Sequence, residues 1–296
     1  MPLDQESVAP AWRSVVRMAA AVVTASAVHG SPPAATGPVL VALDIDGTIA
    51  GPGNTISDAT LDAVAQVRAA GHHVVLASGR SLVGILPVAA RLGLTDGWVV
   101  ASNGAVTARL GDHLPGGYAL EDVRTFDAGP AMRLARALLP HVKLAVEEIG
   151  WGYRVLSLFP PSDVNGRQQV VGLSDLWTAP VTRAIVRAPG AVHALLEPLR
   201  RIGVTATPAA SDWIDVIPDR LSKAISLERI RVRLGVAREH TVAVGDGVND
   251  LEMMAWALRS VAMGHSPQAV LQAADEVTGS LADDGLVPVL RSLLPR

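Results

Sequence analysis

The chain has 296 residues, a length that usually divides into two domains. Hydrophobic residues make up 49% and charged residues 18%, which excludes an intrinsically disordered protein. The net charge of −3 leaves no basic excess, so neither nucleic acid nor a membrane surface is expected as a partner. The absence of cysteine excludes disulfides, thiolate catalysis and cysteine-bound metals, and fits a reducing, cytoplasmic location.

Residues 1–37 differ from the rest and are expected to form an N-terminal extension, disordered or loosely docked. The stretch MAAAVVTASAVHGSPPAATG is small and apolar, which is faintly similar to a secretory signal. However, Asp4 and Glu6 stand where a signal is basic, and the apolar run of about 11 residues is too short to span a bilayer. The other interpretation left open is that the start codon has been placed too early, upstream of the true one.

From residue 38 onward, strand and helix alternate. Residues 38–44 form a continuous apolar run, as a strand buried on both faces requires, and a helix is predicted at 57–71. Strands at 73–78 and 97–102 with a helix at 81–93 complete a βαβαβ pattern, which predicts a parallel sheet. The alternation returns late in the chain, with helices at 222–235, 249–258, 266–274 and 283–294 and strands at 241–245 and 260–263.

The middle of the chain predicts a different unit. Its helices and strands mix without βαβ alternation, which is typical of an α+β domain. We therefore expect a core formed by 38–119 and 211–296, with an α+β cap at 120–210 inserted into it. The elements expected in this middle part are helices at 129–139 and 191–201 and strands at 143–148, 153–157, 181–188, 204–208 and 213–218.

Polar side chains follow three of the predicted core strands. Asp44 and Asp46 come after the first, Ser78 after the second, and Asp246 and Asp250 after a late strand. Because the carboxyl ends of parallel strands form the ligand crevice of an open sheet, these groups are expected around one cavity. Clustered carboxylates require a cation to stay ionised together, and hard oxygen ligands suit Mg²⁺.

The spacing of the residues excludes two other kinds of metal site, a calcium loop and a histidine zinc site. A calcium loop starting at Asp44 needs glycine and glutamate where the chain has Ile49 and Thr55. A loop starting at Asp246 fails at its sixth position, which is Leu251. The sequence also holds no pair of histidines at zinc-binding spacing.

The motifs DIDGT, ASGR, a later lysine and GDGVND follow one another in this order. They resemble the four motifs of the haloacid dehalogenase (HAD) superfamily. Three further features are similar to the Cof-type, or type IIB, branch: the stretch ASNGA, a cap between the second and third motifs, and VAMGHSP followed by DDGLV. The resemblance covers about residues 39–290 and implies a Rossmann-like parallel-sheet core with a C2B cap. LSKA and AMGHS depart from the common Ser-Lys-Gly and Met-Gly-Asn-Ala, and neither removes a catalytic group.

The resemblance implies distinct roles for the acids. Asp44 would attack phosphorus and form an aspartyl-phosphate, and Asp46 would act as general acid and then as base. Asp44, the backbone carbonyl of Asp46 and Asp246 would bind Mg²⁺. The alternative, an Asx turn at the end of a strand, explains DGT but not two acids after a buried run.

Lys223 is one of only two lysines in the chain. It stands in the first turn of a predicted helix, where a cation opposes the helix dipole, so a purely stabilising role is disfavoured. The resemblance implies that it neutralises the phosphoryl group and Asp44, with Asp250 holding Lys223 or a metal-bound water. Lys143 has no such context and is expected in solvent.

Phosphate contacts are implied for Ser78, Gly79, Arg80 and Asn249. Helix N-capping is an alternative for Ser78 and Asn249, and surface solvation for Arg80. In the cap, Trp151 and Tyr153 flank a turn and are expected in the core rather than at the substrate.

The predicted function is a Mg²⁺-dependent phosphatase acting on a small phosphorylated metabolite, such as a sugar phosphate, as a monomer or weak homodimer. A phosphomutase or phosphotransferase on the same core is the enzymatic alternative. A metabolite-binding regulator without turnover is the other alternative, and the complete set of acids argues against it.

Overall fold

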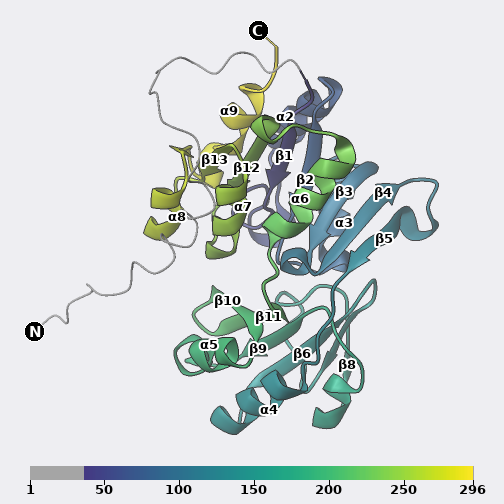
Figure 1. Cartoon of the computed structure of the whole chain (residues 1–296), viewed down its shortest axis with the longest axis vertical. Coiled ribbons are helices and arrows are strands. Elements are labelled where there is room, and N and C mark those ends of the chain that lie inside the picture. Colours follow the sequence, from purple (N-terminus) through teal and green to yellow (C-terminus); the bar gives the residue numbers. More distant parts are fainter. Residues whose placement is uncertain (1–36, 296) are drawn as a thin grey trace, which may run out of the picture. The chain divides into compact units, whose positions relative to one another are not determined.

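The computed structural model describes residues 37–295 of the chain (Figure 1). The predicted N-terminal extension therefore lies outside the described residues, apart from its last one. The described part holds an eight-stranded and a six-stranded sheet. None of the helices in this part combines the length and the apolarity needed to cross a membrane.

The larger sheet forms the α/β core. Its strands are β1 (Leu40–Leu43), β2 (His73–Ala77), β3 (Asp96–Ala101), β4 (Val106–Gly111), β5 (Tyr118–Val123), β12 (Thr241–Gly245), β13 (Arg259–Ala262) and β14 (Glu276–Val277). They lie in the order β14-β13-β12-β1-β2-β3-β4-β5. Strands β14 to β3 are parallel, and β4 and β5 extend the edge antiparallel. Strand β1 is therefore central, with its carboxyl end between those of β12 and β2.

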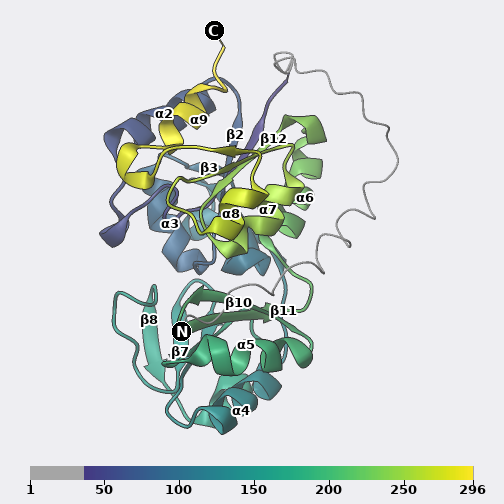
Figure 2. The ribbon, with the colours of Figure 1, turned by 90° about the vertical axis from the view of Figure 1, so that its left-hand side faces the viewer.

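Helices cover both faces of the core sheet (Figure 2). They are α2 (Asp58–Ala69), α3 (Leu82–Arg91), α6 (Lys223–Leu234), α7 (Leu251–Trp256), α8 (Gln268–Ala273) and α9 (Leu286–Arg291). Val41 and Leu43 pack against α2, α3 and α9, whereas Leu40 and Ala42 pack against α6 and α7. Successive side chains of a strand point to opposite faces, so an unbroken apolar run is what a strand between two helix layers needs.

Local signals set the ends of these helices. The Ser57 side chain caps α2 by accepting a hydrogen bond of 3.1 Å from the backbone N–H of Thr60. Gly71 follows α2 with φ +86, and Gly235 ends α6 with φ +65, a backbone region that favours glycine.

The smaller sheet belongs to the inserted cap. Its elements are α4 (Gly129–Leu138), β6 (Lys143–Glu148), β7 (Gly152–Val155), β8 (Arg167–Val170), β9 (Ala184–Arg187), α5 (Ala191–Arg201), β10 (Val204–Ala210) and β11 (Trp213–Pro218). The strand order is β10-β11-β9-β6-β7-β8, antiparallel except for the β7–β8 pair. Leu144 and Val186 pack with Met132 of α4 and Leu195 of α5, so the helices cover one face of this sheet.

The predicted fold class, a parallel-sheet α/β core with an inserted α+β cap, is confirmed. Four strands were not predicted: β4, β5, β8 and β14. Strand β8 is polar and mostly exposed at a sheet edge, and β14 has two residues, so neither carries an apolar pattern. The sheets also divide the chain at other points than 120 and 210, because β5 continues the core sheet and β11 pairs with β9 in the cap.

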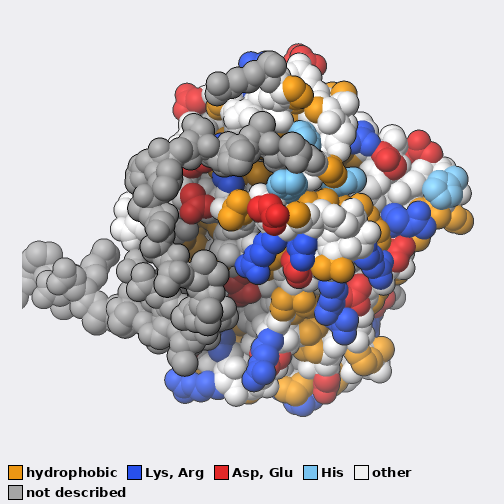
Figure 3. Space-filling view, turned by 45° about the horizontal axis from the view of Figure 1, so that its top comes forward, with side chains coloured by type: hydrophobic (Ala, Val, Ile, Leu, Met, Phe, Trp, Pro, Cys, Tyr) orange, Lys and Arg blue, Asp and Glu red, His pale blue; other side chains and the backbone are white. Residues whose placement is uncertain are grey.

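Basic and acidic side chains are interspersed on the face of the molecule drawn in Figure 3. This distribution agrees with a net charge of −3 and a mixed surface.

Candidate active site

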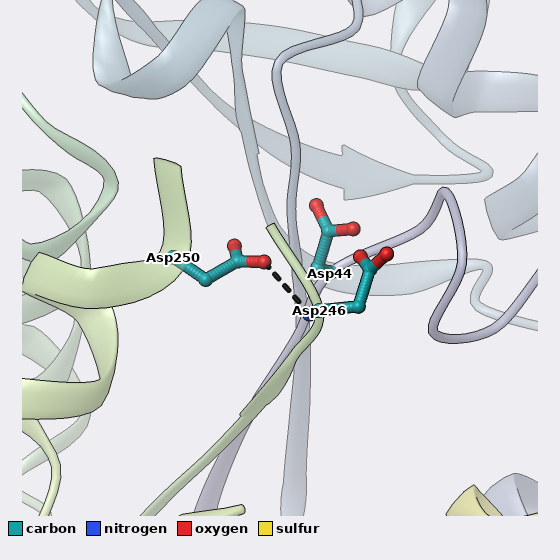
Figure 4. Close-up of side chains that lie close together, drawn as sticks. All are labelled: Asp44, Asp246 and Asp250. Carbon is teal, nitrogen blue, oxygen red and sulfur yellow. Dashed lines mark hydrogen bonds between the residues drawn. The ribbon is translucent and has the colours of Figure 1, made fainter. Parts of the chain in front are cut away.

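Three aspartates meet at the carboxyl ends of β1 and β12. Asp44 follows β1, Asp246 follows β12, and Asp250 ends the short turn Val248–Asp250 before α7. One carboxylate oxygen from each lies within 4.8 Å of the others (Figure 4). The two strands are neighbours in the sheet, which brings together acids that are 202 to 206 positions apart in the sequence.

Lys223 lies between two of these acids. Its Nζ donates hydrogen bonds of 2.6 Å to Asp44 Oδ1 and 2.6 Å to Asp250 Oδ1. Only 1% of Lys223 is exposed. Burial alone would lower the pKa of Lys223, but the carboxylates of Asp250 and Asp44 outweigh that effect and raise it, so the lysine is charged.

Burial also raises the pKa of Asp44 well above its usual value, and the charge of Asp250 adds to this, while Lys223 opposes both. Burial and Asp250 raise the pKa of Asp246 to about 6. Both pKa shifts have the same two causes: burial, which is the larger, and the negative charge of a neighbouring carboxylate. A cation bound between Asp44 and Asp246 would lower both pKa values.

The three acids differ in which of their carboxylate oxygens already accept hydrogen bonds. Asp250 Oδ2 accepts hydrogen bonds from the backbone N–H groups of Asp246, at 3.0 Å, and Gly247, at 2.9 Å, while its Oδ1 binds Lys223. Asp44 Oδ2 and both side-chain oxygens of Asp246 accept no hydrogen bond from any of residues 37–295, although His265 Nε2 lies 3.6 Å from Asp246 Oδ2. Asp44 and Asp246 thus offer hard oxygen donors to a divalent cation, whereas the oxygens of Asp250 hold the loop and Lys223.

Gly47 makes room for the Asp246 carboxylate. Its φ is +78, and a Cβ at this position would lie 2.2 Å from Asp246 Oδ2. Both the backbone conformation and the space therefore require glycine here.

The Asp46 side chain does not join the cluster of Asp44, Asp246 and Asp250. Arg80 donates hydrogen bonds of 2.8 Å from Nε to Asp46 Oδ2 and 2.5 Å from Nη2 to Asp46 Oδ1. A further bond of 2.7 Å joins Arg80 Nη1 to Asn54 Oδ1. The Asp46 side chain is 63% exposed, so its carboxylate is not one of the clustered acids, and Arg80 binds this acid rather than lying in solvent.

The predicted phosphate-binding residues follow β2 and β12, the two strands on either side of β1. Ser78 is buried directly after β2, and its Oγ accepts a hydrogen bond of 3.1 Å from the Arg80 backbone N–H. It does not cap α3, because the N-cap position is Ser81. A Cβ on Gly79 would lie 3.2 Å from the Asn103 side chain, which in turn accepts a hydrogen bond of 3.1 Å from Asn249 Nδ2.

Sequence reasoning missed several polar groups near these loops. Asn103, with φ +52, belongs to the ASNGA stretch, which served only as a family marker. Glu147, Arg183 and Asp215 are buried charged residues of the cap. A signal was present for Asp215, the one charge in the apolar segment WIDVIP, whereas Glu147 and Arg183 share KLAVEE and VTRAIVRA with other charged residues. Of the cap aromatics expected in the core, Tyr153 is buried, but Trp151 is 36% exposed, so that expectation was wrong for Trp151.

Comparison with known proteins agrees with this arrangement. The chain is 29% identical over 269 residues to a 5-amino-6-(5-phospho-D-ribitylamino)uracil phosphatase of Bacillus subtilis, covering 86% of this chain and 97% of that protein. It is 26% identical to a pyridoxal phosphate phosphatase of Escherichia coli, with 86% and 98% covered. The solved structure of a HAD subclass IIB sugar phosphatase superposes with a TM-score of 0.71 at 20% identity, over 86% of this chain and 100% of that one, and so shares the fold.

Residues 41–116 and 192–290 match the family of haloacid dehalogenase-like hydrolases. These segments span more than half of the chain and include both halves of the core with all the clustered acids. The chain therefore belongs to the haloacid dehalogenase-like hydrolases, and its resemblance to their Cof-type branch is confirmed.

Proposed function

We propose that the protein is a Mg²⁺-dependent phosphatase that hydrolyses a small phosphorylated metabolite through an aspartyl-phosphate on Asp44. The observation that carries the proposal is the arrangement of the buried residues Asp44 and Lys223 beside Asp246, in which one carboxylate oxygen of Asp44 stays free beside a charged lysine. Membership of the hydrolase family and the names of the phosphatase relatives support this reaction class.

In the first step, a carboxylate oxygen of Asp44 attacks phosphorus, and the bond from phosphorus to the ester oxygen breaks. Lys223 offsets negative charge on the phosphoryl oxygens, and Asp46 protonates the departing oxygen. In the second step, Asp46 takes a proton from water, which attacks the phosphoryl group and releases phosphate from Asp44. The Asp46 side chain is 63% exposed and bound to Arg80, so the proposed proton transfer includes its release from Arg80.

The free oxygens of Asp44 and Asp246 fit a divalent cation, and the backbone carbonyl of Asp46 is the third proposed ligand. Bound Mg²⁺ would supply positive charge opposite the phosphoryl oxygens and favour the ionised form of Asp44. Asp250 stays outside this ligand set, because both of its oxygens already bind Lys223 and the backbone.

Removal of the metal tests the proposal. EDTA is expected to abolish hydrolysis of p-nitrophenyl phosphate, and Mg²⁺ is expected to restore it, whereas Ca²⁺ restores little because its coordination is larger and looser. Calorimetry should show Mg²⁺ binding to the wild type and much weaker binding to Asp246→Asn. Full turnover in metal-free buffer, or equal Mg²⁺ affinity of the two proteins, would contradict the proposal.

Gly47→Ala tests the geometry around Asp246. The new methyl group would collide with Asp246 Oδ2, so the carboxylate has to move and Mg²⁺ affinity should fall by about 10- to 100-fold, as for other disturbed metal surroundings. Gly53→Ala is a matched control, because Gly53 also has positive φ, +69, but nothing lies within 4 Å of its added Cβ. Equal Mg²⁺ affinities of the two variants would show that the space at Gly47 is unimportant.

A further inference from the structure

Asp246 differs from the other clustered acids in its partner. Lys223 donates hydrogen bonds to Asp44 and Asp250, whereas neither carboxylate oxygen of Asp246 accepts one from residues 37–295. Its basic neighbour is His265, whose Nε2 lies 3.6 Å from Asp246 Oδ2. Carboxylates that bind a metal in proteins are usually held by a hydrogen-bond donor of their own, so His265 stands where such a donor is needed.

The backbone on either side of His265 is fixed at the carboxyl end of β13, the strand next to β12. The Met263 N–H donates a hydrogen bond of 3.1 Å to the carbonyl of Gly245, the last residue of β12. The Gly264 N–H donates 3.0 Å to the Gly279 carbonyl. Because β12 and β13 are parallel, this loop lies at the same edge of the sheet as the acids.

A further hydrogen bond orients the imidazole ring. The Leu281 N–H donates 3.4 Å to His265 Nδ1. A ring nitrogen that accepts a hydrogen bond carries no hydrogen, so Nε2 carries it, and the atom that faces Asp246 is a donor. The separation of 3.6 Å exceeds a hydrogen bond, and a movement of about 0.4 Å would complete one. The His265 side chain is 37% exposed, so it has room for this movement.

The same position is one where the sequence departs from its family motif. AMGHS carries histidine where the common Met-Gly-Asn-Ala carries asparagine. The amide nitrogen of asparagine is as many bonds from Cα as Nδ1 of histidine, whereas Nε2 is one bond further along the side chain. From this backbone, histidine therefore brings a donor closer to Asp246 than asparagine would.

We propose that His265 is a positioning residue of the metal site, whose Nε2–H holds Oδ2 of Asp246 and keeps that carboxylate beside Asp44 for the divalent cation (Figure 4). A ligand that is held in place before the cation arrives loses less freedom on binding, so Mg²⁺ binds more tightly. The inference rests on the metal dependence of the proposed phosphatase.

Calorimetry of Mg²⁺ binding to the substrate-free protein tests the assignment. His265→Leu and His265→Asn remove the donor that reaches Asp246, so each should lower Mg²⁺ affinity by about 10- to 100-fold. His265→Gln carries its amide nitrogen as far along the side chain as Nε2, so its Mg²⁺ affinity should stay within about threefold of the wild type. Should His265→Leu not fold, the comparison of His265→Asn with His265→Gln decides in the same way.

His193→Leu is the matched control, because His193 is exposed on α5 of the cap and its replacement should leave Mg²⁺ affinity unchanged. Melting temperatures in EDTA should agree among the His265 variants, which separates a weaker metal site from a weaker fold. A folded His265→Leu that binds Mg²⁺ as tightly as the wild type would overturn the inference, and so would a His265→Gln that loses as much affinity as His265→Leu. A wild type that binds no Mg²⁺ would instead remove the metal dependence of the proposed function, and this inference with it.

Discussion

Lys223→Met is expected to lower kcat for phosphate release by about 10³-fold. The substitution removes the ammonium group of Lys223, the only group in the described part of the chain that donates hydrogen bonds to both Asp44 and Asp250. It also leaves two buried carboxylates without a cation. Breaking a buried ion pair by removing one partner costs about 3–5 kcal/mol, so the free energy of unfolding should fall by a similar amount. Steady-state kinetics and chemical denaturation measure the two effects.

The chain offers a matched control in its other lysine. Lys143 is half-buried on β6, where its Nζ donates 2.6 Å to the Leu158 carbonyl and approaches the Phe159 ring. Lys143→Met removes the same functional group, and it should cost less than about 1 kcal/mol and leave kcat unchanged. Similar kinetic losses in the two methionine variants would show that Lys223 has no special role.

The sequence predicted structure best where hydrophobic burial alone determines it. The apolar run before Asp44 predicts a strand covered on both faces, and β1 packs against helices on both sides. Because parallel strands place their carboxyl ends together, the same reasoning predicts that Asp44, Asp246 and Asp250 meet, which the structure shows. Their proximity follows from topology, and no property of the individual residues was needed to predict it.

Side-chain direction could not be predicted in the same way. Asp46 has the spacing to lie beside Asp44, but it sits past the end of β1 and its carboxylate binds Arg80. The buried charged residues of the cap, Glu147, Arg183 and Asp215, were missed for a different reason. Glu147 and Asp215 lie in strands about 70 residues apart, and only the pairing of β6, β9 and β11 brings them near Arg183. Strand order in an antiparallel sheet depends on tertiary packing, which periodicity does not encode.

The variants Asp44→Asn and Asp46→Asn should lose activity at different steps of the reaction. Asp44→Asn loses the attacking oxygen, so no covalent intermediate forms and turnover should vanish. Asp46→Asn keeps the nucleophile, Asp44, and leaves Lys223, whose Nζ lies 2.6 Å from Asp44 Oδ1 in the wild type, unchanged. What this variant loses is proton transfer, typically worth about 10²- to 10⁴-fold.

An activated aryl phosphate needs little protonation of its leaving group, so the first step survives better in Asp46→Asn than the second, which still requires a base for water. Asp46→Asn should therefore accumulate phosphorylated protein when mixed with p-nitrophenyl phosphate, and Asp44→Asn should not. Acid-quenched mass spectrometry should locate a single phosphate on Asp44. A phosphate on serine or histidine, or rapid turnover by Asp44→Asn, would overturn the mechanism. An unlabelled Asp46→Asn that still turns over at the wild-type rate would remove only the role given to Asp46, since Asp44 would then act without it.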